Sequence, residues 1–207
     1  MTFEETKAVK DRIRAAHRHR RASLSAKERE EAGAALASHG LAWADSVMDG
    51  SAATVCVYLG VGAEPPTLPL IRALYDGGRR ALLPVCEPGR ELKWVFWAPG
   101  TDLVTSRFAP ILEPVGTRQE IEVAGQAGAL FIPATAVDLA GSRVGQGGGY
   151  YDKFLGHLAS AGKNIPLAAV IYDEELLPAG SIPVEEFDRP VPGVVLPSGF
   201  RKLAVGA

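Results

Sequence analysis

The sequence is poor in cysteine and contains no long apolar run. Its 207 residues include two cysteines, Cys56 and Cys86, each inside an apolar segment and without metal-ligand spacing. We therefore expect buried, reduced thiols. No apolar run approaches the roughly 20 residues that a membrane-spanning helix needs, and the polar N-terminus does not resemble a secretory signal. Together these absences predict a cytoplasmic protein with no membrane partner.

An excess of either charge sign is also missing. The chain carries 22 Lys and Arg against 24 Asp and Glu, which gives a formal net charge of -2. This balance provides no general electrostatic attraction to nucleic acid or to an anionic membrane. The length suits a single domain, residues 1–207, with a core large enough to fold without disulfides.

Glycine, by contrast, is concentrated in one segment. Residues 130–132 are apolar, a polar loop follows, and residues 150–158 have apolar side chains at helical spacing. We expect a strand, a loop and a helix that begins near Gly149 or Tyr150. Glycine lets the backbone approach a ligand closely and adopt positive φ. Because the free N–H groups at a helix start attract anions, this arrangement indicates phosphate binding.

Neither common glycine motif is present. A P-loop would end in Gly-Lys followed by Ser or Thr, and a dinucleotide fingerprint would follow its strand directly, whereas a loop with Asp138 intervenes here. A mobile surface turn is the simplest alternative. The flanking residues favour a phosphate site, since Arg143 precedes the glycines and Asp152 follows them. Asp152 could complement the helix dipole or hold Mg²⁺ beside the phosphates.

A basic segment near the N-terminus, residues 4–21, has the apolar spacing of a helix. Three roles are open for its cations: a solvated helix face, contacts to nucleic acid, or contacts from one or two of them to a bound nucleotide. Ser25 and Glu28 then form a capping box that starts a second helix.

Residues 54–59 and 81–85 are apolar, β-branched runs on either side of a helical segment at 68–75, which Thr67 can cap. This order predicts a parallel β-α-β unit with a right-handed crossover, in a sheet covered on both faces. Ligands of such sheets bind at the carboxyl ends of the strands, where Glu64 lies, although a loop glutamate is more often simply solvated. Further strands are expected at 92–97, 167–171 and 191–196, an irregular segment at 107–116, and a short helix or strand at 119–123.

The glycine segment resembles the signature of the 5-formyltetrahydrofolate cyclo-ligase family. The run D-x-x-G-x-R-x-G-x-G-G-G-Y-Y-D-K spans residues 138–153 and is similar to the family pattern in its acidic, glycine, arginine and tyrosine positions. Val144 stands where the family usually has Leu, and Val137 where it has Phe. Gln146 and Gly148 stand where many members carry basic residues, so the number of charges that the loop itself brings is open.

Three other segments of the chain are more weakly similar to the family, and their order along the sequence is that of the family. Lys10 and Arg14 lie four residues apart, on one helical face from which both could reach the same triphosphate. The segment 64–67 is similar to an E-x-x-T loop that binds the pterin. Asp188 lies where the family has its C-terminal aspartate, although Phe187 replaces the usual His before it.

The resemblance implies an α/β fold, in a single three-layer domain with a mostly parallel sheet flanked by helices. It also implies ATP- and Mg²⁺-dependent cyclisation of 5-formyltetrahydrofolate to 5,10-methenyltetrahydrofolate, through a phosphorylated formyl oxygen and with release of ADP and phosphate. The implied catalytic cations are Lys10 and Arg143. The implied nucleotide contacts are Lys10, Arg14, Arg143, Gly145, Gly147, Gly148, Gly149, Tyr150 and Tyr151. The implied folate contacts are Val61, Glu64, Gln146 and Tyr150, and the implied metal ligands are Asp152 and Asp188.

Other functions are open. One is a phosphosugar or nucleotide-binding α/β enzyme with different chemistry on a similar loop. Another is an RNA-binding module led by the basic first helix, against which the acidic overall balance counts. A third is a family member without activity, against which the intact Arg143, Asp152 and Lys10 count. We expect a monomer with a small-molecule substrate and no nucleic-acid partner.

Overall fold

The computed structural model describes residues 1–49 and 53–204; residues 50–52 and 205–207 of the expected domain 1–207 lie outside the described residues. The helices are α1 Phe3–Ser23, α2 Ala26–Val47, α3 Leu68–Asp76, α4 Ile121–Ala124 and α5 Tyr150–Ser160, with 3₁₀ turns η1 Pro88–Arg90 and η2 Asp173–Glu175. The strands are β1 Thr54–Val57, β2 Arg80–Glu87, β3 Glu91–Trp97, β4 Leu103–Thr105, β5 Leu112–Pro114, β6 Ala129–Pro133, β7 Ala136–Asp138, β8 Arg143–Val144, β9 Leu167–Val170, β10 Leu176–Leu177, β11 Gly193–Leu196 and β12 Gly199–Lys202.

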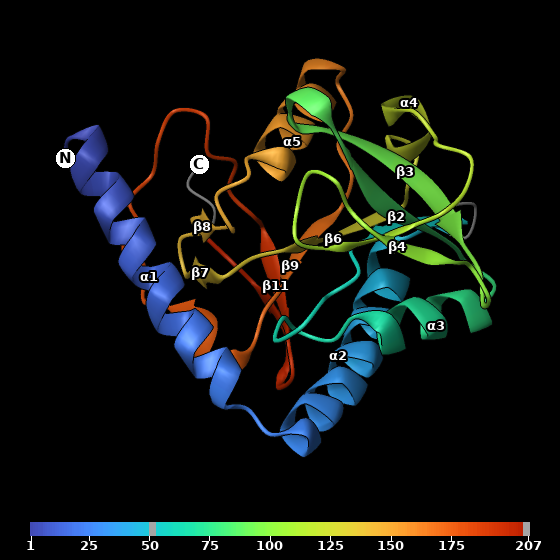
Figure 1. Cartoon of the computed structure of the whole chain (residues 1–207), viewed down its shortest axis with the longest axis horizontal. Coiled ribbons are helices and arrows are strands. Elements are labelled where there is room, and N and C mark those ends of the chain that lie inside the picture. Colours follow the sequence, from blue (N-terminus) through green and yellow to red (C-terminus); the bar gives the residue numbers. More distant parts are fainter. Residues whose placement is uncertain (50–52, 205–207) are drawn as a thin grey trace.

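A seven-stranded sheet in the order β12-β11-β9-β6-β1-β2-β3 forms the centre of the molecule (Figure 1). Its five inner strands run parallel, and the edge strands β3 and β12 run antiparallel to their neighbours. In β1, Val55 pairs with Ala81 of β2 on one side and with Ala129 of β6 on the other. The predicted parallel β-α-β unit and the mostly parallel sheet are thereby confirmed.

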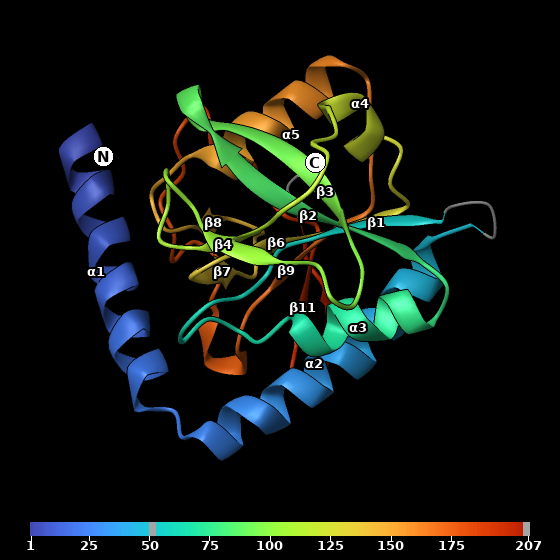
Figure 2. The ribbon, with the colours of Figure 1, turned by 45° about the vertical axis from the view of Figure 1, so that its right-hand side comes forward.

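Helices cover both faces of this sheet, as Figure 2 shows, with α2 and α3 on one face and α4 and α5 on the other. Alternate strand residues enter two separate cores because successive side chains point to opposite faces. Phe131 packs with Trp43 and Leu70 under α2 and α3, whereas Leu130 packs with Phe154 of α5 on the opposite face. The expected three-layer arrangement is confirmed.

The first helix lies outside these layers. α1 stands along one end of the sheet (Figure 1) and crosses the small sheet β10-β7-β8. Capping boxes at Thr2 and Ser25 start α1 and α2, the second as predicted. Among the helices described, none combines the length and apolarity that crossing a bilayer requires.

Several short strands differ from the sequence prediction. The segment expected to be irregular contains β5, which pairs with β4, and β11 is followed by a further edge strand, β12. Residues 119–123 contain both alternatives, since Gln119 bridges Trp94 and α4 begins two residues later. Each missed strand has only two to four residues, too few for a period of two to stand out.

The path of the chain across the sheet reverses between β1 and β6. After β1 the chain moves outward to β2 and β3, and it later returns to β6 on the other side of β1. Loops that leave two such strands diverge, and ligands of open α/β sheets bind at this position. The loop after β1 carries Glu64, and the chain after β6 leads to the glycines, so the sequence-predicted residues meet here.

Candidate functional site

Asp138 organises the loop that leads to the glycines. Its buried carboxylate accepts the N–H groups of Ala140 and Ser142 at 3.0 Å each, which closes the turn between β7 and β8. Its other oxygen accepts the N–H groups of Gly180 and Ile182 at 3.1 and 3.3 Å. The first residue of the motif therefore fixes the glycine loop and fastens the C-terminal segment beside it.

The glycine loop ends at the start of α5. Gly147 and Gly149 have φ values of 93° and 72°, which residues with a Cβ rarely adopt. Gly149 is the N-cap of α5, so no side chain covers the first N–H groups of the helix, which lack intrahelical partners. Residues 146–148 are exposed. The predicted strand, glycine loop and helix start are all present and leave the backbone open to an anion.

Two of the predicted cations lie against this loop. Arg14 donates from Nε to the carbonyl oxygen of Gly145 at 2.8 Å, and its guanidinium lies 3.8 Å from the position that a Cβ would take at Gly147. Arg143 is 8% exposed and pairs with Asp152. Among the residues that the structure describes, the buried Nε of Arg143 has no partner. Because an unsatisfied buried donor is costly, this N–H group suits an incoming acceptor.

The third cation links α1 to the C-terminal segment. The Nζ of Lys10 lies 2.6 Å from a carboxylate oxygen of Glu185 and 2.6 Å from one of Asp188. Asp188 also accepts the N–H of Glu185 at 2.9 Å. The N–H of Arg189 lies 3.4 Å from the carboxylate of Asp152, so the two predicted metal ligands occupy neighbouring positions. Within residues 1–49 and 53–204, no group of three or more His, Cys, Asp or Glu is arranged to hold a metal.

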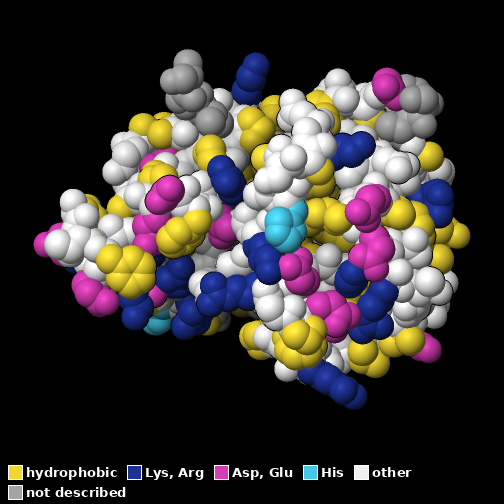
Figure 3. Space-filling view, turned by 90° about the horizontal axis from the view of Figure 1, so that it is seen from above, with side chains coloured by type: hydrophobic (Ala, Val, Ile, Leu, Met, Phe, Trp, Pro, Cys, Tyr) yellow, Lys and Arg dark blue, Asp and Glu magenta, His cyan; other side chains and the backbone are white. Residues whose placement is uncertain are grey.

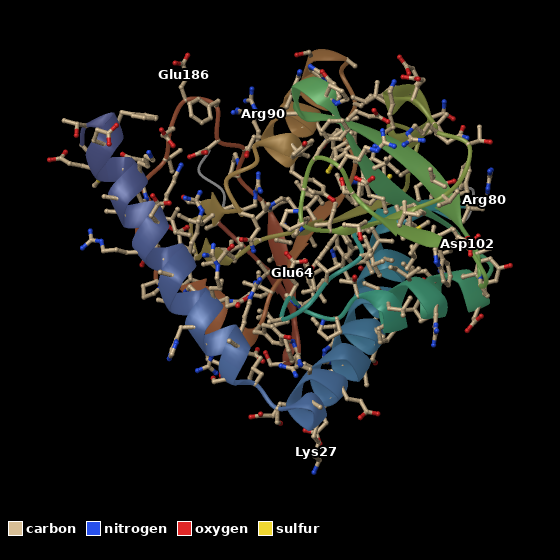
Figure 4. All side chains as sticks on the ribbon, viewed as in Figure 1. Lys27, Glu64, Arg80, Arg90, Asp102 and Glu186 are labelled. Carbon is tan, nitrogen blue, oxygen red and sulfur yellow. The ribbon has the colours of Figure 1, made fainter. Side chains whose placement is uncertain are left out.

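Glu64 and Gln146 meet across the loops that follow β1 and β6. The Glu64 carboxylate accepts the N–H of Val61 at 3.2 Å, and the nearby Gln146 side chain also favours its charged form. Burial raises the pKa of Glu64 above its ordinary value, and these groups and nearby Arg21 offset only part of that effect. Figure 4 shows Glu64, on the loop after β1, near the centre of the molecule. This carboxyl group can therefore serve as an acceptor or, when protonated, as a donor to a polar ring.

Thr67 shapes the same loop from within. It occupies the N-cap position of α3 but does not cap the helix with its side chain, which corrects the expected capping role. Its hydroxyl donates to the carbonyl oxygen of Tyr58 at 2.6 Å and accepts the N–H of Gly60 at 2.8 Å. These bonds fold the chain back on itself and present Glu64 toward the glycine loop.

The two tyrosines at the start of α5 lie between the glycine loop and the core. The ring of Tyr150 lies 3.1 Å from the position of a Cβ at Gly148, and burial followed by the influence of Cys86 raises its pKa. Desolvation raises the pKa of Tyr151 far more. Its buried hydroxyl has no hydrogen-bond partner in the described part of the chain. Both hydroxyls are thus neutral at physiological pH and can still bind a ligand.

A cavity of about 220 Å³ opens beside Arg143 and Asp188, with Ser142, Val184 and Pro190 among its walls. On the face shown in Figure 3, several basic side chains lie next to one another at the lower left, and acidic side chains lie beside them. That face offers a local site for a charged ligand.

Some residues of this region escape the sequence prediction. Arg21, one of the many cations of α1, is 4% exposed and forms a buried pair with Glu175 at 2.6 Å. Glu185 is one carboxylate in an acidic segment, and nothing local marks it as a partner of Lys10. Arg90 lies in the β2–β3 turn, where a Pro-Gly pair signals only the turn itself. The partners of Arg21 and Glu185 are distant in sequence, so no spacing rule could identify them.

Comparison with known proteins identifies the family. The sequence model of the 5-formyltetrahydrofolate cyclo-ligase family matches residues 6–197. A 5-formyltetrahydrofolate cyclo-ligase of Mycolicibacterium smegmatis is 38% identical over 152 residues, which cover 71% of this chain and 75% of that protein. The protein of the same name from Escherichia coli K12 is 33% identical over 183 residues, covering 87% of this chain and 96% of that one.

Solved structures share the fold. An NMR structure of the Aquifex aeolicus 5,10-methenyltetrahydrofolate synthetase has a TM-score of 0.75 and 25% identity, and the match covers 96% of this chain and 95% of that one. A Mycoplasma pneumoniae protein of that name has a TM-score of 0.69 at 17% identity, with 90% and 97% covered. The matched residues 6–197 include every predicted site residue, from Lys10 to Asp188. The chain therefore belongs to the 5-formyltetrahydrofolate cyclo-ligase family and is an enzyme of folate-dependent one-carbon metabolism.

Proposed function

We propose that this enzyme cyclises 5-formyltetrahydrofolate to 5,10-methenyltetrahydrofolate with Mg²⁺-ATP, releasing ADP and phosphate. The observation that carries the proposal is the meeting of a glycine loop, three cations and two carboxylates at one end of the sheet. Arg14 bonds the loop at Gly145, while Arg143 and Lys10 pair with the two aspartates beside it. All these groups come from one chain, and we propose a monomer as the active unit.

The chemical problem is that the oxygen of the formyl group on N5 is a poor leaving group at neutral pH. Transfer of the γ-phosphoryl group of ATP to that oxygen breaks the bond to ADP and forms a phosphate ester. N10 then attacks the formyl carbon and loses its proton, and the C–O bond breaks as phosphate departs. Both steps require positioning and charge neutralisation and need no protein nucleophile.

The cations supply that neutralisation. Lys10, Arg14 and Arg143 would bind phosphate oxygens through charge-assisted hydrogen bonds, which are stronger than neutral ones. The backbone N–H groups from Gly145 to Gly149, with those at the start of α5, would hold the β- and γ-phosphates. Tyr151 would lie beside the nucleotide. The unpartnered Nε of Arg143 fits this role, since a phosphate oxygen would satisfy it.

Asp152 and Asp188 would hold the Mg²⁺ ion, whose bound form supplies further charge neutralisation to the phosphates. Magnesium is commonly held by one or two carboxylates together with phosphate oxygens, and the site offers two neighbouring carboxylates. Each of them pairs with a cation that we assign to the phosphates: Asp152 with Arg143 and Asp188 with Lys10. On binding of Mg²⁺-ATP the cations would turn to the phosphates and the carboxylates to the metal.

The folate would lie on the other side of the glycine loop, against Val61, Glu64, Gln146 and Tyr150. The side chains of Glu64 and Gln146 lie near each other and so can form one polar edge. A pterin ring carries donors and acceptors along its edge, which such a carboxyl–amide pair can match. The hydrogen bond from the Val61 N–H to Glu64, at 3.2 Å, would help to keep this edge in place.

The test is formation of methenyltetrahydrofolate from 5-formyltetrahydrofolate, followed by absorbance, with and without ATP and Mg²⁺. We expect turnover only when both are present. Asp152→Asn should lower it by roughly 10² to 10³-fold, the usual cost of losing one charge-stabilising group, in a protein that circular dichroism shows to be folded. Asp102→Asn is the matched control, because Asp102 is exposed and lies far from Glu64 in Figure 4.

Each other outcome has a definite meaning. ATP binding without turnover would move the assignment to a different α/β enzyme that uses a similar loop. Turnover without ATP would contradict the phosphorylated formyl oxygen. Full activity of Asp152→Asn would remove Asp152 from the metal site.

A further inference from the structure

We propose that Arg90, in the β2–β3 turn, is a further phosphate-binding residue for the triphosphate held by the glycine loop. The proposal rests on the nucleotide-dependent function proposed above and adds a contact from a residue 55 positions before Gly145. Figure 4 shows Arg90 at the tip of the β2–β3 hairpin, near the start of α5.

The backbone at Arg90 is unusual. Glu87 and Glu91 pair across the hairpin, which leaves Pro88, Gly89 and Arg90 as the turn. Gly89 has a φ of 72° and Arg90 a φ of 64°. Arg90 is the one non-glycine residue with positive φ in the described part of the chain. Glycine or asparagine would adopt this conformation at lower cost, so the turn alone does not explain an arginine here.

The side chain of Arg90 extends to the end of the glycine loop. Its Nη1 lies 3.4 Å, and its Cδ 3.6 Å, from the position that a Cβ would take at Gly149. Gly149 is the N-cap of α5, so the guanidinium occupies the space beside the free N–H groups of the helix start. An anion bound to those N–H groups would lie within reach of Arg90.

The turn is held in this place by contacts that do not involve the Arg90 side chain. Lys153 in the first turn of α5 donates to the carbonyl oxygen of Gly89 at 2.9 Å and lies 2.5 Å from the carboxylate of Glu91. His157, one turn later, lies 3.7 Å from the same carboxylate. Both neighbours of Arg90 are therefore fastened to α5, and the guanidinium has no anchoring task.

The charge around the loop also leaves a role for Arg90. The other cations each have a carboxylate: Arg14 has Asp11 at 2.6 Å, Arg143 has Asp152, and Lys10 has Glu185 and Asp188. No carboxylate of the described residues pairs with Arg90. The loop residues 144–151 bring no basic side chain of their own. Arg90 thus brings a positive charge without a carboxylate partner to the helix start, and an anion is its natural partner.

The experiment compares Arg90→Ala, Arg90→Lys and Arg90→Gly with the control Arg118→Ala. Arg118 pairs with Glu87 at 2.5 Å, next to the turn of the same hairpin, so the control removes the same charge without touching the loop. Calorimetry measures binding of a non-hydrolysable ATP analogue with Mg²⁺, and of inorganic tripolyphosphate. The KM values for ATP and for 5-formyltetrahydrofolate are measured in parallel.

We expect Arg90→Ala to weaken the binding of the ATP analogue and of tripolyphosphate about tenfold, as for one lost charge-assisted hydrogen bond. It should raise the KM for ATP and leave the KM for 5-formyltetrahydrofolate unchanged. Arg90→Lys should recover part of the loss. Arg90→Gly should raise the melting temperature, because glycine relieves the left-handed strain, while losing as much affinity as Arg90→Ala. A purely structural turn residue would not separate stability from affinity in this way.

Equal affinity of the unchanged protein and Arg90→Ala would overturn the Arg90 contact and leave the proposed function standing. An equal loss in Arg118→Ala would also overturn it, since the effect would then be one of general charge. Failure of the unchanged protein to bind either the analogue or tripolyphosphate would overturn both the contact and the nucleotide-dependent function.

Discussion

At the scale of single residues, Glu64 combines a raised pKa with a place in the proposed folate site, and perturbed pKa values are common at functional sites. We expect Glu64→Gln to raise the KM for the folate substrate and to leave the KM for ATP nearly unchanged. The reason is that the glutamine retains the shape of the side chain but cannot change its protonation to suit the ring. Initial rates at varied folate and varied ATP would measure both values.

The same substitution should make stability depend differently on pH. Burial raises the pKa of Glu64 from an ordinary value of 4.5, so the folded state holds the proton more tightly than the unfolded state. The stability that this provides is complete below pH 4.5 and is lost as the pH rises through the folded-state pKa. The melting temperature of Glu64→Gln, measured relative to that of the unchanged protein, should therefore rise between pH 4 and pH 8. Parallel curves across that range would contradict the raised pKa.

Asp138 is a residue of the motif whose role is structural. Asp138→Ala leaves four backbone N–H groups without their carboxylate acceptor. We expect a loss of at least about 3 kcal/mol in the free energy of unfolding, since each unsatisfied buried group costs about 1–3 kcal/mol. Denaturant titration measures the loss, and Asp138→Asn should lose less because its amide oxygen can still accept. A loss below about 1 kcal/mol would show that water replaces the carboxylate.

The sequence indicates the residues of the motif but not the Asp138 clamp, by which we mean the four hydrogen bonds that the Asp138 carboxylate accepts. Two of the four N–H groups belong to residues 42 and 44 positions later in the chain. The two nearby partners of Asp138 follow from ordinary turn chemistry. The distant ones depend on where β10 and the segment after it lie, which no local pattern determines.

At the scale of elements, α1 is fastened to the rest of the molecule mainly by charged side chains. Side-chain hydrogen bonds hold it at three positions along its length, from Lys10, Arg14 and Arg21. Only Ile13 of this helix packs against an apolar cluster, together with Ala136, Val144 and Ile182. A helix with so little apolar contact depends on these polar bonds for its place.

Arg21→Met tests that dependence. The change leaves Glu175 buried without its partner, and breaking a buried ion pair from one side costs about 3–5 kcal/mol. Hydrogen exchange should rise in residues 3–23 more than in the central sheet, and Mg²⁺-ATP affinity should fall as Lys10 and Arg14 lose their positions. Arg20→Met is the control, since Arg20 pairs with Glu174 at the surface, where such pairs contribute about 0–1 kcal/mol. Uniform exchange in both variants would mean that α1 is held by other contacts.

The long elements are predictable from sequence, and the short ones are not. Capping and apolar spacing locate α2 and α5 within a few residues of their observed ends. β7, β8 and β10 have two or three residues each, and their pairing is decided by the Asp138 clamp and by α1. Such strands exist because of tertiary contacts, so their own residues carry no periodic signal.

At the scale of the whole molecule, ligand binding should stabilise the fold. If Mg²⁺-ATP binds only the folded state, a concentration of 100 times the Kd adds about 2.7 kcal/mol. For a chain of this length that corresponds to a rise of about 5–10 °C in melting temperature. Thermal scans with ATP alone, Mg²⁺ alone and both together would measure it, and Asp152→Asn should reduce the rise. No rise with both ligands would contradict nucleotide binding.

The overall architecture follows from sequence in part. The β-α-β unit predicts parallel strands, and the unbroken apolar runs predict layers on both faces. The order of the strands does not follow, because the return of the chain from β5 to β6 passes through irregular segments that carry no directional signal. The candidate site forms where the chain returns to β6. Its assembly therefore depends on the strand order, which sequence patterns do not predict.

The arrangement of α1 has a consequence for synthesis. A ribosome makes α1 before the elements that hold it, since the partners of Lys10 lie 175 and 178 residues later, and that of Arg21 lies 154 residues later. These bonds can therefore form only after the C-terminal segment has been made. A nascent chain that stops before Glu185 can contain the glycine loop but neither carboxylate partner of Lys10. The proposed phosphate site would thus stay incomplete until the ribosome has passed Asp188.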